Sequence, residues 1–270
     1  MKKFLAILFV AILLAVGVSA AETVIYENDF SDPATLWDFT QYGLNWEIRD
    51  GGLYMTDTLA PAAPKGTNSG HILYNAPQAL DNYVVDVDFM HAGNQSGVVV
   101  RAQASKANHK THAYAGYFAY VANKGDQGAF GISSEKGWTG LLNGGPFSKN
   151  FYRDVNLHIQ VIAKDQKIGV KFTNIDTNVL VYDYVYTIGS NTNFDHIYTS
   201  GTFGFRMSVK HEDFVAAGYS YFDNLVVTTA NETVPQKSQV AVAVATRIDT
   251  KDITPVYTNT FDSAVNAGIP

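Results

Sequence analysis

Two segments of the chain alternate between apolar and polar residues with a period of two, and this pattern constrains the fold more than any other feature. In an extended strand, residues 155–161 place four apolar side chains on one face and three polar ones on the other. Residues 83–89 show a similar pattern. The polar residues that oppose the two apolar stripes are Asn156, His158 and Gln160 in the first segment and Asp86 and Asp88 in the second. Strands with one apolar and one polar face are typical of antiparallel sheets that cover a core on one side.

The rest of the chain offers short apolar segments separated by turn signals, and no amphipathic helix of three turns. Turn-forming residues cluster at 50–52, 123–126, 163–166 and 189–191. Further strands are expected at 71–74, 97–103, 115–122, 129–133, 167–173, 179–186, 201–209 and 219–227. Many short strands at this spacing predict an all-β protein, either an antiparallel sandwich or a barrel.

The composition excludes several classes of protein. The chain has 270 residues, of which 46% are hydrophobic and 16% are charged, so it is too apolar to remain disordered. It contains no cysteine, which excludes disulfides, iron–sulfur clusters, thiolate zinc sites and cysteine nucleophiles. The net charge of −6 argues against general binding of nucleic acid.

Residues 1–20 have the three parts of a secretory signal. Lys2 and Lys3 precede an apolar stretch, and small residues follow it up to a cleavage point after Ala20. The alternative is a retained membrane anchor, but the apolar run is short for a span of about 20 residues. We therefore expect a protein that is secreted or held at the cell surface.

The remaining chain divides into three parts. Residues 21–228 contain the predicted strands, and residues 229–253 read as a linker with one further apolar segment. Residues 254–261 then resemble residues 23–30, because Thr, Tyr, Asn and Phe coincide at a constant offset. We interpret residues 254–270 as the start of a second, truncated copy in a tandem protein, with chance similarity between two short strands as the alternative.

The order of several short motifs resembles the concanavalin A-like lectin/glucanase superfamily. These motifs are Asn28-Asp29-Phe30, residues 46–53, the 83–89 strand, residues 97–101, residues 201–205 and the closing residues 221–227. The superfamily includes laminin G-like modules, family 16 glycoside hydrolases and keto-disaccharide hydrolase-like domains. The resemblance implies an antiparallel jelly-roll β-sandwich of two sheets, and function does not follow from the fold.

The same resemblance implies a structural calcium ion where the first and last strands meet. Calcium binds carboxylate, carbonyl and water oxygens. The matching positions are Glu27 or Asp29 in the opening segment, a carbonyl of the 50–52 turn such as that of Gly51, and Asp223 in the closing strand. The alternative is that Asp29 caps a turn and Asp223 bonds the backbone.

A catalytic interpretation needs paired carboxylates. The Glu-x-Asp-x-x-Glu string that the resemblance to family 16 would require is missing. Asp86 and Asp88 come nearest, since they share one strand face, but a solvated face explains them as well. We therefore expect no catalytic activity, with a glycan hydrolase of the laminarinase-like or keto-disaccharide hydrolase-like kind as the alternative.

Sugar recognition accounts for more residues than catalysis does. Sugars stack on aromatic rings and pair their hydroxyls with polar side chains. We expect glycan contacts from Arg101, Gln103, Tyr117 and Trp138. In the alternative interpretation the aromatic residues lie in the core and Arg101 neutralises Asp86 or Asp88. Trp37 and Trp46 are expected in the core because each lies in an apolar segment.

The sequence thus predicts an exported, non-catalytic module that binds a polysaccharide or a cell-surface glycan, within a multi-domain protein. Besides the glycan hydrolase, a structural surface module that binds protein remains as an alternative.

Overall fold

The computed structural model describes residues 22–56, 67–91, 95–103, 115–124, 127–134, 139–148, 155–190, 197–210 and 220–230. The predicted signal at 1–20, residues 231–253 of the predicted linker at 229–253, the second copy at 254–270 and Trp138 lie outside these residues. In the part described, no helix is long and apolar enough to cross a membrane.

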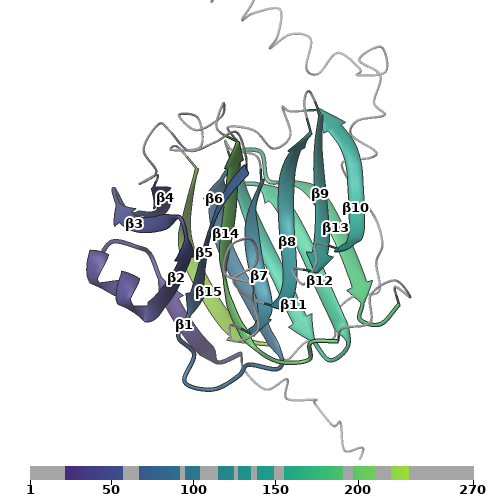
Figure 1. The fold of residues 1–270 in the computed structure, drawn as a ribbon. Coiled ribbons are helices and arrows are strands. Elements are labelled where there is room, and N and C mark those ends of the chain that lie inside the picture. Colours follow the sequence, from purple (N-terminus) through teal and green to yellow (C-terminus); the bar gives the residue numbers. More distant parts are fainter. Residues whose placement is uncertain are drawn as a thin grey trace, which may run out of the picture.

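The described chain forms fifteen strands and one short 3-10 helix, arranged as two facing antiparallel sheets (Figure 1). Sheet A has the order β13-β12-β11-β6-β15-β4-β3, with β1 also paired to β15. Sheet B has the order β10-β9-β8-β7-β14-β5-β2. The elements are β1 (Val24–Asn28), η1 (Pro33–Asp38), β2 (Phe39–Gly43), β3 (Asn45–Arg49), β4 (Gly52–Thr56), β5 (Thr67–Tyr74), β6 (Tyr83–Met90), β7 (Gln95–Gln103), β8 (Ala115–Lys124), β9 (Gln127–Ser134), β10 (Thr139–Ser148), β11 (Asn156–Lys164), β12 (Lys167–Asn174), β13 (Val179–Thr187), β14 (Thr202–Lys210) and β15 (Tyr221–Thr229). The expected sandwich is confirmed, and the barrel is not formed.

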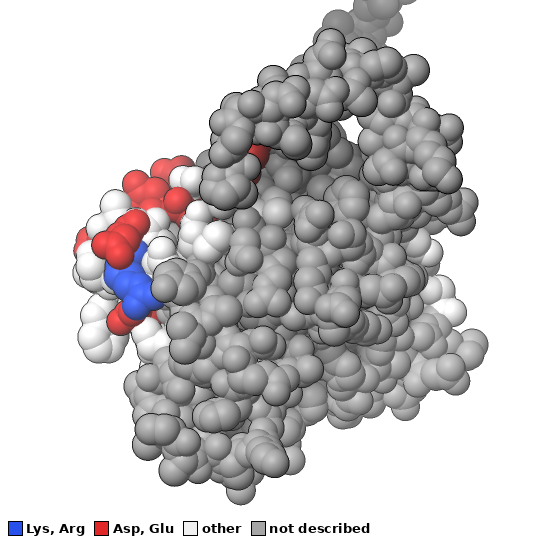
Figure 2. Space-filling model, turned by 90° about the horizontal axis from the view of Figure 1, so that it is seen from above, with Lys and Arg blue, Asp and Glu red and all other residues white. Residues whose placement is uncertain are grey.

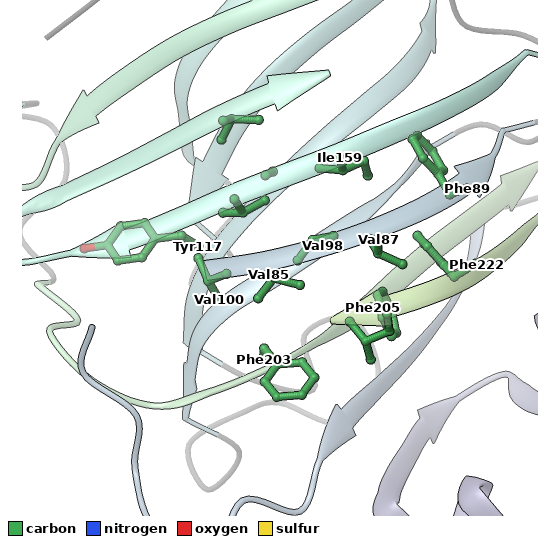
Figure 3. Close-up of a cluster of buried hydrophobic side chains, with 14 of the residues drawn as sticks. Val85, Val87, Phe89, Val98, Val100, Tyr117, Ile159, Phe203, Phe205 and Phe222 are labelled. Carbon is green, nitrogen blue, oxygen red and sulfur yellow. The ribbon is translucent and has the colours of Figure 1, made fainter. Parts of the chain in front are cut away.

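The apolar stripes found in the sequence meet between the sheets. In sheet A, β6 and β11 pair so that Val85 lies opposite Val161 and Phe89 opposite Leu157, and all four are buried. Figure 3 shows Val85, Val87, Phe89 and Ile159 of this sheet facing side chains of sheet B such as Val98 and Phe205. The ring of Phe205 stacks on that of Phe222 in sheet A with centroids 4.4 Å apart. The alternation of apolar residues therefore builds the layer that holds the sheets together.

The first and last strands of the sandwich are neighbours. β1 pairs with β15 through Asn28 opposite Leu225 and Val24 opposite Thr228. The first and last strands of the sandwich therefore lie side by side in sheet A, as the resemblance implied.

The hairpin between β3 and β4 confirms a turn signal. Asp50 and Gly51 have φ angles of 50° and 74°, and Arg49 pairs with Gly52 across them. Two central residues with positive φ match the twist of the flanking strands, which explains the Asp-Gly pair.

The two tryptophans of the described residues differ. Trp46 is buried against Phe222, as expected. The expectation for Trp37 is wrong, because its side chain is 87% exposed on η1. The apolar signal around Trp37 came from its neighbour Phe39, which enters the core while η1 turns the tryptophan outward.

Candidate functional site

The outer face of sheet A gathers polar side chains from three adjacent strands. Strand alternation turns Asp86 and Asp88 of β6 away from the core, and it does the same for His158 and Gln160 of β11. The register places His158 directly opposite Asp88 and Gln160 opposite Asp86. On the other side of β6, Asp223 of β15 also lies opposite Asp88. Three strands distant in sequence therefore form one polar patch.

His158 bridges the two aspartates of β6. Its Nδ1 lies 2.7 Å from Asp88 Oδ1 and its Nε2 lies 3.1 Å from Asp86 Oδ1. Gln160 Nε2 donates to the same Asp86 oxygen at 3.0 Å. Both ring nitrogens of His158 are thus engaged by carboxylates.

These contacts fix the charges of the patch. Hydrogen bonds to Asp86 and Asp88, together with their negative charge, outweigh burial and raise the pKa of His158 to about 9. Burial acts to raise the pKa of Asp88, but hydrogen bonds from His158 and Asn224 and the charge of His158 lower it overall. At neutral pH, His158 is therefore an imidazolium and Asp88 a carboxylate.

A bulge in β15 brings Asn224 to this patch. The register between β15 and β6 shifts between Asp223 and Val226, and Asn224 has a φ of 50°. Its side-chain amide then donates to Asp88 Oδ2 at 3.0 Å, while its backbone N–H donates to Asp223 Oδ1 at 2.6 Å. The bulge thus aims an amide at the carboxylate that His158 holds from the other side.

A cavity of about 190 Å³ opens beside these groups. Its lining is Asp88, Phe89, Asn156, Ile175, Tyr221, Asp223 and Asn224. At about 30 Å³ for each water, this volume corresponds to about six waters, which is room for a single small polar ring. The lining combines carboxylates, amides and one phenol with apolar walls from Phe89 and Ile175.

Asp88 and Asp223 both line this cavity, and their pKa values are shifted in opposite directions. Burial, followed by repulsion from Asp88 and then from Asp29, raises the pKa of Asp223. The pKa of its cross-strand neighbour Asp88 is lowered. The cavity therefore contains two carboxyl groups that differ in their readiness to take up a proton.

Two neighbouring tyrosines, Tyr221 and Tyr54, form an aromatic shelf that extends from the cavity toward the edge of sheet A. Tyr221 lies opposite Tyr54 of β4, with ring centroids 5.6 Å apart and planes tilted by 37°. The Arg49 guanidinium lies 4.3 Å from the centre of the Tyr54 ring and contacts Glu47 at 2.6 Å. Tyr221 OH also donates to Asn156 Oδ1 at 3.3 Å. The shelf and the cavity share Tyr221.

The family comparison identifies the domain. Residues 28–205 match the model of the 3-keto-alpha-glucoside-1,2-lyase-like domain. The chain belongs to this family. The keto-disaccharide hydrolase-like resemblance in the sequence is therefore confirmed.

One of three similar solved structures supports the fold of this lyase-like domain. A legume lectin-like domain from Entamoeba histolytica has a TM-score of 0.50 at 9% identity, covering 77% of this chain and 97% of that one. The carbohydrate binding module CBM66 from Bacillus subtilis has a TM-score of 0.45 at 14% identity, with 71% and 96% covered. The lumenal domain of VIP36 in its Ca²⁺- and Man3GlcNAc-bound form has a TM-score of 0.46 at 12% identity, with 74% and 86% covered. The first of these supports the concanavalin A-like sandwich. A search of curated proteins gave no match.

The structure brings together some of the predicted site residues of the lyase-like domain. Asp86 and Asp88 share the outer face of sheet A, and Asp88 lines the cavity while Asp86 does not. Gln103 ends β7 in the other sheet, where its amide donates to the carbonyl of Ser200 at 3.3 Å. The described members of the predicted catalytic and glycan-binding sets therefore lie on different sheets.

Arg101 and Tyr117 lie in the interior of the domain. Arg101 is fully buried and has a φ of 52°, and its guanidinium donates to the carbonyls of Asp81 at 3.1 Å and Tyr198 at 3.4 Å. Tyr117 is buried between the sheets, where its hydroxyl accepts from the Tyr198 backbone N–H. Neither side chain reaches the surface, so we do not include them in the sugar-binding set below. Arg101 also does not neutralise Asp86 or Asp88, which lie on sheet A.

Calcium binding at Glu27, Asp29, Gly51 and Asp223 stays a prediction. Asp29 is exposed, and its Oδ1 accepts from the N–H and hydroxyl of Ser31. Asp223 accepts from the Asn224 backbone, and Gly51 forms the β3–β4 turn. Within the described ranges, no three His, Asp or Glu side chains group in a way that could hold a metal. Glu27 is also exposed, and the charge of Asp29 lies near enough to Asp223 to raise its pKa.

Sequence reasoning did not assign Asn224, Asn156 or Tyr221 to the site. Asn156 was placed on the polar face of its strand, and this was the one usable signal. The bulge that aims Asn224 has no local signature in the sequence.

Sheet B presents a different outer face. Leu73, Val99 and Phe118 form a second apolar cluster there and are buried. Arg206 lies opposite His71 in register, and its guanidinium lies 4.9 Å from the centre of the Phe118 ring. Since His71 and Arg206 are also buried, the residues described on this face present no open polar surface comparable to that of sheet A.

Proposed function

We propose that the domain is an exported carbohydrate-binding module that holds one sugar unit in the cavity on the outer face of sheet A. The observation that carries the proposal is the lining of that cavity. Asp88, Asn156 and Asn224 offer hydrogen-bond acceptors and donors, and Tyr221 offers an aromatic ring next to them. This is the chemistry that recognises a pyranose, which has hydroxyls on its rim and C–H groups on its faces.

The protonation of His158 and the hydrogen bonds of His158 and Asp88 favour sugar binding over acid–base catalysis. His158 is protonated, and both of its N–H groups are directed at carboxylates, so it has no lone pair with which to take a proton. Asp88 uses one oxygen for His158 and the other for Asn224. Each Asp88 oxygen has a second lone pair, which suits Asp88 to accept a hydrogen bond from a sugar hydroxyl.

The charge around the cavity supports a neutral glycan over an acidic one. Asp88 and Asp223 line the cavity, and none of its lining residues is basic. In Figure 2, described acidic side chains also gather on the side of the molecule where Figure 1 shows β3 and β4. A uronic acid brought to this surface would meet like charge, so we expect neutral sugars to bind more tightly.

The test is binding of wild type and variants to a glycan array, followed by calorimetry on a neutral sugar that the array identifies. Asn156→Ala and Tyr221→Ala should each weaken binding about tenfold or more, because each removes a cavity wall. Tyr221→Phe keeps the aromatic ring and removes the hydroxyl, so it distinguishes the contributions of the two groups to binding. Thr228→Ala, farther along β15, is the matched control and should bind like wild type. The absence of glycan binding by the wild type would contradict the proposal and favour a protein-binding module.

A second candidate function is glycan cleavage, as in the family name. The specific observation is that Asp88 and Asp223 lie opposite each other on neighbouring strands, line one cavity and have pKa values displaced in opposite directions. In this interpretation the protein catalyses hydrolysis: Asp223 donates a proton to the leaving glycosidic oxygen as the C–O bond breaks, and ionised Asp88 accepts a proton from the water that attacks the anomeric carbon.

Release of reducing or unsaturated sugars from a panel of polysaccharides and disaccharides tests cleavage. If cleavage occurs at this cavity, Asp88→Asn and Asp223→Asn should each abolish product release while sugar binding persists. Asp183→Asn on β13, outside the cavity, is the control. Binding without any product release would favour the module.

Export is proposed from residues 1–20 alone. The N-terminal sequence of the protein recovered outside the cell checks it, and the expected first residue is Ala21.

A further inference from the structure

Trp37 is exposed in a way that the fold does not explain. Its side chain is 87% exposed, which is the largest value among the exposed hydrophobic residues of the described chain. Trp46, the other described tryptophan, is 3% exposed. Indole carries one of the largest apolar surfaces of any side chain, so leaving it in water forgoes a substantial part of the free energy that burial would supply.

The backbone beneath Trp37 is tightly fixed. Asp32 caps η1 by accepting a hydrogen bond from Ala34 N–H at 2.9 Å. The carbonyl of Trp37 accepts from Asn75 Nδ2 at 3.2 Å, and the Asn75 N–H donates to the carbonyl of Asp38 at 2.8 Å. Thr40 Oγ1 in turn donates to Asn75 Oδ1 at 2.6 Å. The ring is therefore presented from a preorganised turn, which lowers the entropic cost of using it as a contact.

Polar groups surround the base of this turn. Asp38, Thr40 and Asn75 are all exposed. Asp38 Oδ2 accepts from Tyr26 OH at 2.8 Å, and within the described residues its Oδ1 accepts no hydrogen bond. An exposed ring with a carboxylate and an amide at its base offers stacking and hydroxyl pairing together.

The neighbourhood fits a sugar ring better than a protein partner. The other large hydrophobic residues with high exposure lie on other elements, such as Val24 on β1 and Ile197 before β14. A protein interface needs about 800 Å² on each side with an apolar centre, whereas a pyranose needs one aromatic face with polar groups nearby.

We propose that Trp37 is a second glycan contact, a stacking platform for a pyranose unit of a polysaccharide, separate from the cavity on sheet A. Trp37 is not among the residues that line that cavity. A single polysaccharide that engages both contacts would gain avidity, because the second contact forms within one complex.

The experiment is affinity electrophoresis and fluorescence titration with a soluble β-glucan, a xylan, a galactomannan and a starch. Trp37→Ala should weaken retention by about tenfold or more on each polysaccharide that retards the wild type, and Trp37→Phe should keep most of it. Ile197→Ala, which removes another exposed hydrophobic side chain, is the matched control and should behave like wild type. Melting curves verify that all variants fold.

Fluorescence gives a second readout. Polysaccharide should shift the tryptophan emission of the wild type to shorter wavelength, and the shift should be lost in Trp37→Phe. Loss of retention in Trp37→Ala but not in Tyr221→Ala would support the platform and contradict the cavity, and the reverse would overturn the platform. Equal retention of wild type and Trp37→Ala, or no retention of the wild type by any polysaccharide, would also overturn it.

Discussion

Replacing His158 by glutamine should lower the stability of the domain near neutral pH and leave it almost unchanged at high pH. The imidazolium ties Asp86 and Asp88 together on the outer face of sheet A. Glutamine removes the positive charge but keeps a polar side chain that suits the solvated face of β11. The two aspartates, which share one face of β6, then lose the cation between them.

The size of the effect follows from the pKa. A rise from 6.5 to about 9 corresponds to roughly 3 kcal/mol of preference for the protonated form in the folded state. Because the His158 side chain is 38% exposed, solvent screening reduces this contribution. We expect a difference in unfolding free energy of about 1–2 kcal/mol between wild type and His158→Gln at pH 6.

The stabilisation by His158 changes with pH in one defined direction. The pKa of His158 is higher in the folded than in the unfolded chain, so its stabilisation is fully present below about pH 6.5. It is lost as the pH rises through about 9. Urea unfolding of wild type and variant at pH 6, 7.5, 9 and 10 measures the difference, and groups common to both proteins cancel.

Two outcomes would refute this reasoning. A gap between the two proteins that stays the same from pH 6 to pH 10 would mean that His158 contributes packing and not charge. A variant more stable than wild type at pH 6 would mean that desolvation of the three groups outweighs their attraction.

Three further predictions concern the rest of the domain. Arg101→Met should cost about 2–4 kcal/mol in urea unfolding, because it removes a buried guanidinium that donates to the carbonyls of Asp81 and Tyr198, and a cost near zero would contradict this. Gly97→Ala should cost a similar amount, about 2–4 kcal/mol, since its Cβ would collide with the carbonyl oxygen of Ala119, and a melting temperature equal to wild type would show that the strands move apart freely. EGTA should leave the melting temperature of calcium-incubated protein unchanged, because the described residues contain no group of three or more His, Asp or Glu side chains that could hold a metal, and a fall of several degrees would support the calcium site.

Alternation predicted the strands that carry the site but not their partners. Residues 83–89 and 155–161 fall within or next to β6 and β11, which the structure places at Tyr83–Met90 and Asn156–Lys164. Both polar faces were therefore known from the sequence. Their meeting depends on the register between segments about 70 residues apart, which is set by packing of the whole sheet and not by local pattern.

The alternation of apolar and polar residues could not predict the positions where the backbone is irregular. Arg101 was expected to contact glycan, but a register shift between Val100 and Gln103 and a positive φ turn it into the interior. Positive φ is uncommon for any residue except glycine, so nothing in the sequence marks it. The strand β10 was also missed, because its glycines and proline interrupt any alternation.

The two outer faces of the sandwich explain why the site belongs to sheet A. On sheet B the outward residues of β7 and β8, such as Val99 and Phe118, are themselves apolar and buried, so an open polar site cannot form around them. On sheet A, Asp86 and Asp88 of β6 and His158 and Gln160 of β11 point outward and are only partly buried. The regular strands supply these groups, and the bulge at Asn224 then breaks the flat ladder beside the cavity. The Gln160 amide reaches Asp86 across the regular ladder between β11 and β6, whereas on β15 the bulge aims the Asn224 amide at Asp88. The cavity therefore lies beside a backbone bulge that the sequence pattern does not predict.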